Sequence, residues 1–241
     1  MYGVRGKIGV IVPSLNNTLE PEFNRMTPEG VAVYATRLRL ERGVPDDLRA
    51  MANLTEQAGE LLRHADVDVI AYCCTTGSLI DGVDWDEELA GRLHKATNLP
   101  VTTTASAAIA AMQALDIETV SVATPYIDEV NEIERAYIEA RGIQVANIQG
   151  LQFTRGEELH SLDHVAARKF CAAAMHDLAD GLFVSCTDFA SIDFAEELER
   201  DLGKPVITSN TATLWEVLRL LNITQPIEGF GRLLAGTAGG R

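Results

Sequence analysis

Asp68-Val-Ile-Ala-Tyr-Cys-Cys-Thr75 is a short apolar run that ends in a polar turn, and Asp180-Gly-Leu-Phe-Val-Ser-Cys-Thr187 repeats its pattern. The offset between the two segments is 112 residues, from position 74 to position 186. A second pair, Ile8-Gly-Val-Ile-Val-Pro13 and Val120-Ser-Val-Ala-Thr-Pro125, has the same offset. Two unrelated segments that share one offset predict a chain built from two halves of similar topology.

Short β-branched runs alternate with helix-patterned stretches along the chain, which predicts an α/β fold. The expected strands are 7–12, 31–38, 67–72, 101–103, 119–123, 144–148, 181–185 and 206–208. The expected helices are 46–64, 86–96, 106–115, 128–140, 162–178, 195–202 and 211–221. Such alternation forms mostly parallel sheets covered by helices on both faces. We expect two pseudo-symmetric, tightly packed lobes, 1–114 and 115–241 with a short C-terminal tail, and an active site in the cleft between them.

The repeat places Cys74 and Cys186 at equivalent positions, each at the end of an apolar strand and followed by Thr. A single cysteine at such a place is more often a small buried hydrophobe, but symmetric placement favours chemistry. Across a cleft, one thiolate could remove a proton from carbon while the opposite thiol delivers one, as in a cofactor-free racemase. A helix N-terminus after each strand would lower the thiol pKa from its usual value of about 8.5. Cys73 and Cys171 are interpreted as packing residues.

Polar side chains follow the same strand ends. Each one alone is typical of an ordinary turn or helix cap. Together they predict a ring of neutral hydrogen-bond donors, which can bind a carboxylate and stabilise an enediolate without a metal or arginine. The candidate substrate-binding residues of this ring are Ser14, Asn16, Thr75, Thr76, Tyr126, Ser209 and Asn210.

Charge and motif content exclude several other functions. The chain has 241 residues, with 20 Lys and Arg against 35 Asp and Glu, a formal net charge of −15. This charge disfavours nucleic acid and anionic membranes as partners. No dinucleotide, nucleoside triphosphate or serine-hydrolase motif occurs, and His160 and His164 are interpreted as a solvated helix face rather than metal ligands. We therefore expect no cofactor and no metal. A cytoplasmic location follows from the four cysteines and the lack of a leader-like segment, and a homo-oligomer is the common state of such proteins.

Five segments resemble the aspartate/glutamate racemase superfamily, and within it the branch of maleate cis-trans isomerases and arylmalonate decarboxylases. They are Ile11-Val-Pro-Ser-x-Asn16, Cys74-Thr-x-Gly-Ser78, Ala123-Thr-Pro-Tyr-Ile127, Ser185-Cys-Thr187 and Gly229-Phe-Gly-Arg-Leu233. The resemblance spans nearly the whole chain in the right order. It implies a two-lobed α/β fold and a cofactor-free site with catalytic Cys74 and Cys186.

The two enzymes of this branch imply different roles for the same residues. In maleate isomerases the residue matching Cys74 attacks an alkene carbon, and those matching Asn16 and Tyr126 hold carboxylates. Arylmalonate decarboxylases have one catalytic cysteine, matching Cys186, and glycine in place of the other. Their hydrogen-bonding cradle maps onto Thr75, Thr76, Tyr126 and Thr187. Arg155-Gly-Glu-Glu158 stands where the isomerases carry an Asn.

We predict a cofactor-independent isomerase or racemase that acts on a small mono- or dicarboxylic acid through two opposed cysteines, as maleate isomerases do. One alternative is an arylmalonate-type decarboxylase that uses Cys186 as proton donor. Another alternative, from a different class, is a carboxylate-binding protein without catalysis.

Overall fold

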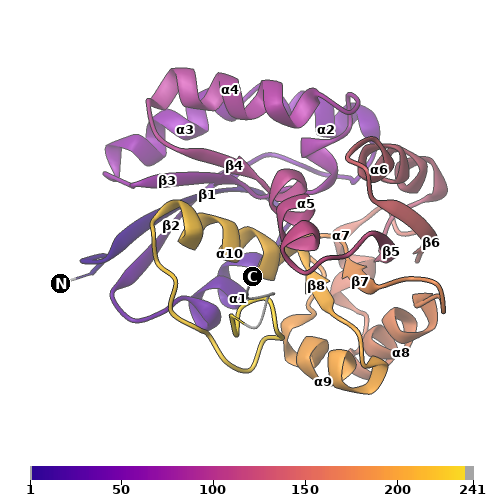
Figure 1. Cartoon of the computed structure of the whole chain (residues 1–241). Coiled ribbons are helices and arrows are strands. Elements are labelled where there is room, and N and C mark those ends of the chain that lie inside the picture. Colours follow the sequence, from indigo (N-terminus) through magenta and orange to yellow (C-terminus); the bar gives the residue numbers. More distant parts are fainter. Residues whose placement is uncertain (1, 237–241) are drawn as a thin grey trace.

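Two four-stranded parallel sheets form the framework of the protein (Figure 1). The computed structural model describes residues 2–236. The first sheet has the order β2-β1-β3-β4 and comprises β1 (Gly6–Pro13), β2 (Val31–Leu38), β3 (Val69–Tyr72) and β4 (Val101–Thr103). The second has the order β6-β5-β7-β8 and comprises β5 (Thr119–Thr124), β6 (Gln144–Gly150), β7 (Gly181–Val184) and β8 (Val206–Thr208). The matching strand orders confirm the predicted α/β fold with two similar halves.

Helices connect the strands and cover both faces of each sheet. They are α1 (Leu19–Met26), α2 (Pro45–Ala52), α3 (Thr55–His64), the 3-10 turn η1 (Thr76–Ser78), α4 (Trp85–Thr97), α5 (Thr104–Ala114), α6 (Asp128–Ala140), α7 (Gly156–His160), α8 (His164–Ala174), α9 (Ile192–Leu202) and α10 (Ser209–Leu220). The helix expected over 46–64 is two helices, because the chain turns at Asn53, a weak helix former. The short α1 and α7 were not expected.

The first sheet is covered by α2, α3 and α4 on one face and by α1 and α10 on the other (Figure 1). Leu62 and Leu93 pack against Ile70 of β3 on the first face. On the second face, Leu214 of α10 packs with Val10 of β1. One of the two helices on this second face, α10, therefore comes from the C-terminal half of the chain.

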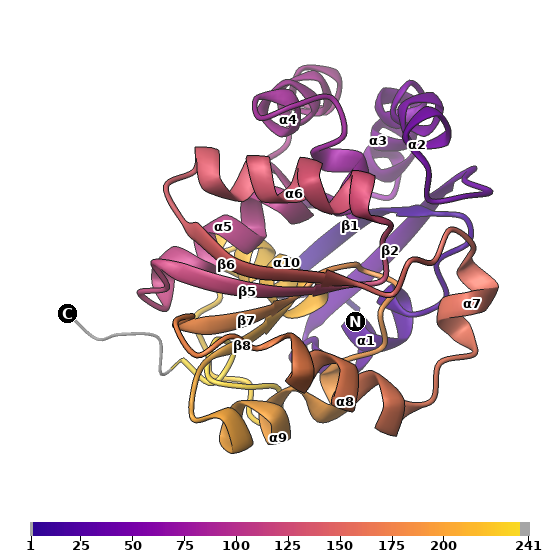
Figure 2. The same ribbon diagram turned by 90° about the vertical axis from the view of Figure 1, so that its right-hand side faces the viewer.

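The second sheet repeats this arrangement, with α5 and α6 on one face and α8 and α9 on the other (Figure 2). Met112 of α5 packs with Val120 and Phe183 of the second sheet. The two halves thus exchange a helix, because α5 covers the C-terminal sheet and α10 covers the N-terminal one. The packing units differ in this respect from the sequence halves 1–114 and 115–241, and residues 237–241 of the expected tail lie outside the described part.

The exchanged helices α5 and α10 pack against each other between the sheets. Each begins directly after a strand and has a threonine cap: Thr103 Oγ1 accepts a hydrogen bond from Ser106 N, and Thr208 Oγ1 accepts one from Thr211 N, both at 3.0 Å. The helices are also joined by a 3.0 Å bond from the Thr213 hydroxyl to that of Thr104. Their contact brings the carboxyl ends of the two sheets together. Ligand sites of open α/β sheets form at such strand ends.

Candidate active site

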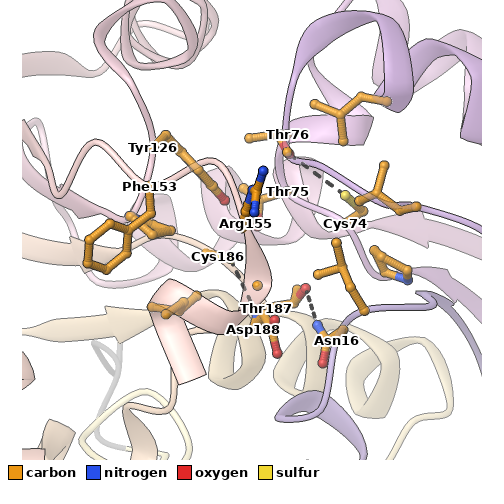
Figure 3. Close-up of a pocket in the computed structure, with 18 of the residues that line it drawn as sticks. Asn16, Cys74, Thr75, Thr76, Tyr126, Phe153, Arg155, Cys186, Thr187 and Asp188 are labelled. Atoms are coloured by element: carbon orange, nitrogen blue, oxygen red, sulfur yellow. Dashed lines mark hydrogen bonds between the residues drawn. The ribbon is translucent and has the colours of Figure 1, made fainter. Parts of the chain in front are cut away.

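A cavity that opens to solvent lies between the carboxyl ends of the two sheets (Figure 3). Both Cys74 and Cys186 line it. Cys74 follows β3 by two residues, and Cys186 follows β7 by two residues. The sequence repeat thus leads to one shared cavity with a thiol from each half, as predicted.

Cys74 is almost fully buried and sits in a tight turn formed by η1. The Gly77 N–H donates to its sulfur at 3.4 Å, and the Thr76 hydroxyl lies 3.8 Å from the sulfur. A Cβ on Gly77 would lie 3.0 Å from the Cys74 sulfur. A glycine is therefore needed beside this thiol for the backbone amide to approach it.

Cys186 is half-buried and has an unusual backbone conformation, with φ of 111°. Non-glycine residues rarely adopt positive φ, and such strain concentrates at functional sites. The backbone is held there because the Cys186 N–H donates to Ser209 Oγ at 3.0 Å. The sulfur accepts a 3.4 Å hydrogen bond from Asp188 N, and the nearby Tyr126 hydroxyl opposes the rise in the pKa of this thiol. These contacts fix the Cys186 thiol at the wall of the cavity.

Burial governs the ionisation of both thiols. It raises the pKa of Cys74 to about 11, although the bonds from Gly77 and Thr76 oppose the shift. Burial raises the pKa of Cys186 more strongly, and the nearby carboxylate of Asp188 adds to the shift. The prediction that a helix N-terminus lowers both values is wrong. The helical turn after Cys74 is only three residues long, and α9 begins six residues after Cys186.

Five of the predicted substrate-binding residues line the cavity: Asn16, Thr75, Thr76, Tyr126 and Thr187. They come from both sheets, and hydrogen bonds across the cleft hold them in place. Asn16 Nδ2 donates to Thr187 Oγ1 at 3.0 Å, and the Thr187 hydroxyl donates to the Cys73 carbonyl at 3.1 Å. The structure therefore assembles most of the expected ring of neutral donors.

The other three predicted residues, Ser14, Ser209 and Asn210, do not line the cavity, which corrects their assignment. The Ser14 hydroxyl is turned away and bonds to the backbone of Leu40. The Ser209 hydroxyl lies 3.0 Å from Thr75 Oγ1 and accepts from Cys186 N. Asn210 Nδ2 donates to the Thr187 carbonyl at 3.0 Å and to Glu22. Ser209 and Asn210 therefore support the residues that line the cavity.

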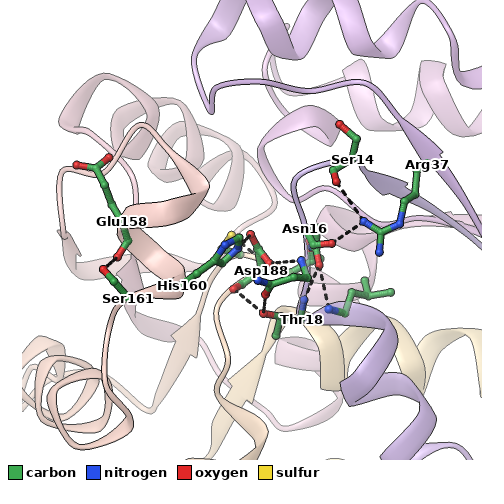
Figure 4. A network of polar contacts seen from close by, with 12 residues as sticks. Ser14, Asn16, Thr18, Arg37, Glu158, His160, Ser161 and Asp188 are labelled. Carbon is green, nitrogen blue, oxygen red and sulfur yellow. Dashed lines mark hydrogen bonds and ion pairs between the residues drawn. The ribbon is translucent and has the colours of Figure 1, made fainter.

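Asp188 is a further cavity residue that the sequence reasoning missed, although it directly follows Cys186-Thr187. Its Oδ2 lies 2.8 Å from His160 Nε2, and its Oδ1 accepts a 2.9 Å bond from Asn17 N (Figure 4). Burial raises the pKa of Asp188, while His160 opposes the shift. His160 is exposed, as predicted, but it does not share a helix face with His164. It ends α7, whereas His164 begins α8, so the two side chains belong to different helices.

One side of the cavity is apolar and comes from segments that carried no signal in the sequence. Its residues are Leu40 and Leu48, from the β2–α2 region, and Phe153 and Leu159, from the segment after β6. Arg155 from the same segment also lines the cavity and projects into the middle of the view in Figure 3. Within residues 2–236, no group of three His, Cys, Asp or Glu side chains is arranged to hold a metal ion. In that same part of the chain, no helix is long and apolar enough to cross a membrane.

The family model for arylmalonate decarboxylase matches residues 8–234. The chain belongs to the arylmalonate decarboxylase family. The maleate isomerase of Pseudomonas putida is 28% identical to it, with coverage of 95% of this chain and 97% of the relative. The arylmalonate decarboxylase of Bordetella bronchiseptica is also 28% identical, with coverage of 94% and 95%.

Solved structures of maleate isomerases are also similar to this member of the arylmalonate decarboxylase family. A cysteine-to-serine variant of the maleate cis-trans isomerase of Nocardia farcinica, with a covalently bound succinylcysteine intermediate, matches with a TM-score of 0.91. The identity is 25%, and the match covers 96% of this chain and 98% of the isomerase. These matches confirm the resemblance found in the sequence and the fold class that it implies.

Proposed function

We propose that this protein is a cofactor-independent cis-trans isomerase of a small unsaturated dicarboxylate such as maleate. The observation that carries the proposal is the pair of thiols, Cys74 and Cys186, which line one cavity from equivalent strand ends of the two sheets. Maleate isomerases among the relatives, and the succinylcysteine formed by one of them, support it.

The reaction needs a nucleophile and an acid. Cys74, after releasing its proton to solvent, attacks one alkene carbon and forms a C–S bond, and the alkene electron pair moves to the adjoining carboxylate as an enediolate. Cys186 then gives its proton to the other alkene carbon, which leaves a succinyl adduct with a central single bond. After rotation about this bond, the Cys186 thiolate takes the proton back. The C–S bond breaks, the trans alkene forms and the Cys74 thiolate is restored.

The surroundings of the two sulfurs support this division of roles. Cys74 accepts bonds from Gly77 N and the Thr76 hydroxyl, both of which favour its thiolate. Desolvation and then the carboxylate of Asp188 disfavour a negative charge on Cys186, whereas Asp188 is the smallest of the effects that act on Cys74. The thiol that loses its proton more readily is therefore Cys74, and Cys186 is the better proton donor.

The neutral donors have the role of holding one carboxylate and its developing charge. Thr75, Thr76 and Tyr126 line the cavity together with Asn16, and the Asn16 amide has one N–H beyond the one that it donates to Thr187. Donors that are fixed before the reaction stabilise an enediolate without the cost of reorganising water.

Single substitutions at the two cysteines test the proposal. Maleate conversion to fumarate, followed by proton NMR, should fall at least about 1000-fold in both Cys74→Ser and Cys186→Ser. Cys74 acts as the nucleophile and Cys186 as the acid, so neither thiol can take over the role of the other. Cys171→Ala is the matched control, since this cysteine is buried on α8 and does not line the cavity. Full activity in either serine variant contradicts the proposal.

The apolar side of the cavity supports a second candidate function, decarboxylation of an arylmalonate. Leu40, Leu48, Phe153 and Leu159 could accept an aryl group, while Cys186 delivers a proton to the carbanion formed on loss of carbon dioxide. Release of carbon dioxide from phenylmalonate that survives Cys74→Gly but not Cys186→Gly would favour this function. A homo-oligomeric state and a cytoplasmic location stay predictions from the sequence.

A further inference from the structure

We propose that Arg155 binds the second carboxylate of the substrate and so selects dianionic acids over their monoanionic analogues. The identity of the substrate rests on the proposed function, whereas the charge preference can be measured without turnover. The inference starts from the charged groups at the cavity. Of the described residues that line it, only Arg155 and Asp188 carry a formal charge.

Asp188 is already engaged. One of its carboxylate oxygens lies 2.8 Å from the His160 ring, and the other accepts from the backbone of Asn17. The cation at the cavity wall is therefore available to a ligand. On a chain with a net charge of −15, attraction for an anionic substrate must be local.

The backbone of Arg155 is fixed while its side chain is free. The N–H groups of Thr154 and Arg155 both donate to Glu158 Oε2 at 3.0 Å, and the Thr154 carbonyl accepts from Gly43 N at 3.1 Å. In the part of the chain that the structure describes, the Arg155 guanidinium has no hydrogen bond or close ion pair, and its charge acts only at longer range, where it helps to lower the pKa of Glu158. It remains exposed, so an incoming carboxylate has no internal ion pair to displace.

The position of Arg155 completes the site. The neutral donors Thr75 and Thr76 follow β3, whereas Arg155 lies on the segment between β6 and α7. Both groups line the same cavity, and Figure 3 labels Arg155 among its lining residues. A molecule with two carboxylates can place one on the neutral donors and the other on Arg155, with its central carbons between them. A guanidinium binds a carboxylate through two parallel hydrogen bonds, which gives orientation as well as affinity.

The experiment compares two ligands of nearly equal shape that differ by one negative charge. Maleate and monomethyl maleate are offered to the intact wild-type protein, Arg155→Met, Arg155→Lys and the control Arg200→Met. Arg200 is exposed on α9 and does not line the cavity. For Arg155→Met we expect kcat/KM for maleate to fall roughly 10- to 100-fold, mainly through KM, because a charge-assisted bond is lost. The value for monomethyl maleate should change less than about threefold, and Arg155→Lys should recover part of the loss.

Equal losses for both substrates in Arg155→Met, or no loss for maleate, would overturn the assignment. A binding measurement separates this result from failure of the proposed function. By calorimetry, wild type should bind succinate at least about tenfold more tightly than monomethyl succinate, and Arg155→Met should lose that preference. A protein that shows the preference but does not isomerise maleate contradicts the isomerase proposal alone. A wild type without the preference contradicts the role of Arg155.

Discussion

The ionisation of Cys74 gives a direct test of how burial changes the pKa of this thiol. Burial raises its pKa from an ordinary value of 9.0 to about 11, which corresponds to about 3 kcal/mol against the thiolate. At pH 8 about one Cys74 in 1000 would be ionised, against about one in ten at the ordinary pKa. The thiolate is the reactive form, so the alkylation rate should rise about tenfold for each pH unit between 7 and 10.

The assay is alkylation by iodoacetamide in unliganded protein, with peptide mass spectrometry to follow Cys74 and Cys186 separately. The profile of Cys186 should have the higher midpoint, because the Asp188 carboxylate disfavours its thiolate. In Asp188→Asn the midpoint of Cys186 should move down, since this charge is removed. Circular dichroism at each pH confirms that the fold is retained. A plateau near pH 9 for Cys74, or a lower midpoint for Cys186 than for Cys74, would refute the reasoning.

Two further substitutions test the packing around the site. Burial raises the pKa of Glu134 from 4.5 to about 7, and neither of its carboxylate oxygens has a hydrogen bond. The folded state therefore holds a proton that the unfolded state releases between these pH values, so stability should fall as pH rises through this window, by up to about 3 kcal/mol. Glu134→Gln should make this decline clearly smaller in urea denaturation at pH 5 and pH 8, while the share of Glu22, whose pKa burial also raises to about 7, should remain. The exposed control Glu129→Gln should keep the full decline, and an undiminished decline in Glu134→Gln argues against the assignment. In Gly77→Ala the new Cβ would lie 2.7 Å from the Tyr72 hydroxyl and 3.0 Å from the Cys74 sulfur. We expect a loss of about 1–3 kcal/mol of stability from overpacking and at least about tenfold lower activity, and unchanged maleate turnover would show that Cys74 needs no such fixed position.

Local sequence patterns predicted all eight strands. The inner strands β1, β3, β5 and β7 are short apolar runs buried on both faces, whereas the edge strands β2 and β6 are partly exposed. The sequence patterns were wrong for two helices, where a single residue changed the local structure. The helix expected over 46–64 breaks at Asn53, and α1 carries Pro21 within its first turn, where proline is tolerated but does not mark a helix strongly.

The sequence likewise predicted only part of the candidate site. The strand ends supplied Asn16, Thr75, Thr76 and Tyr126, because parallel strands bring their carboxyl ends to one edge of a sheet, and the family resemblance added Thr187. Polarity at a strand end does not show which way a side chain turns. The structure alone directs the hydroxyls of Ser14 and Ser209, and the amide of Asn210, away from the cavity.

The sequence by itself determined the duplicated α/β topology and the equivalent places of Cys74 and Cys186, since a repeat with one offset is written in the order of residues. Only the tertiary structure decided that α5 and α10 cross to the opposite sheets and that both thiols line one cavity. It also brought Arg155, from a segment without a recognisable motif, to the wall of that cavity. Burial and proximity depend on contacts between distant parts of the chain, so no local pattern of residues records them.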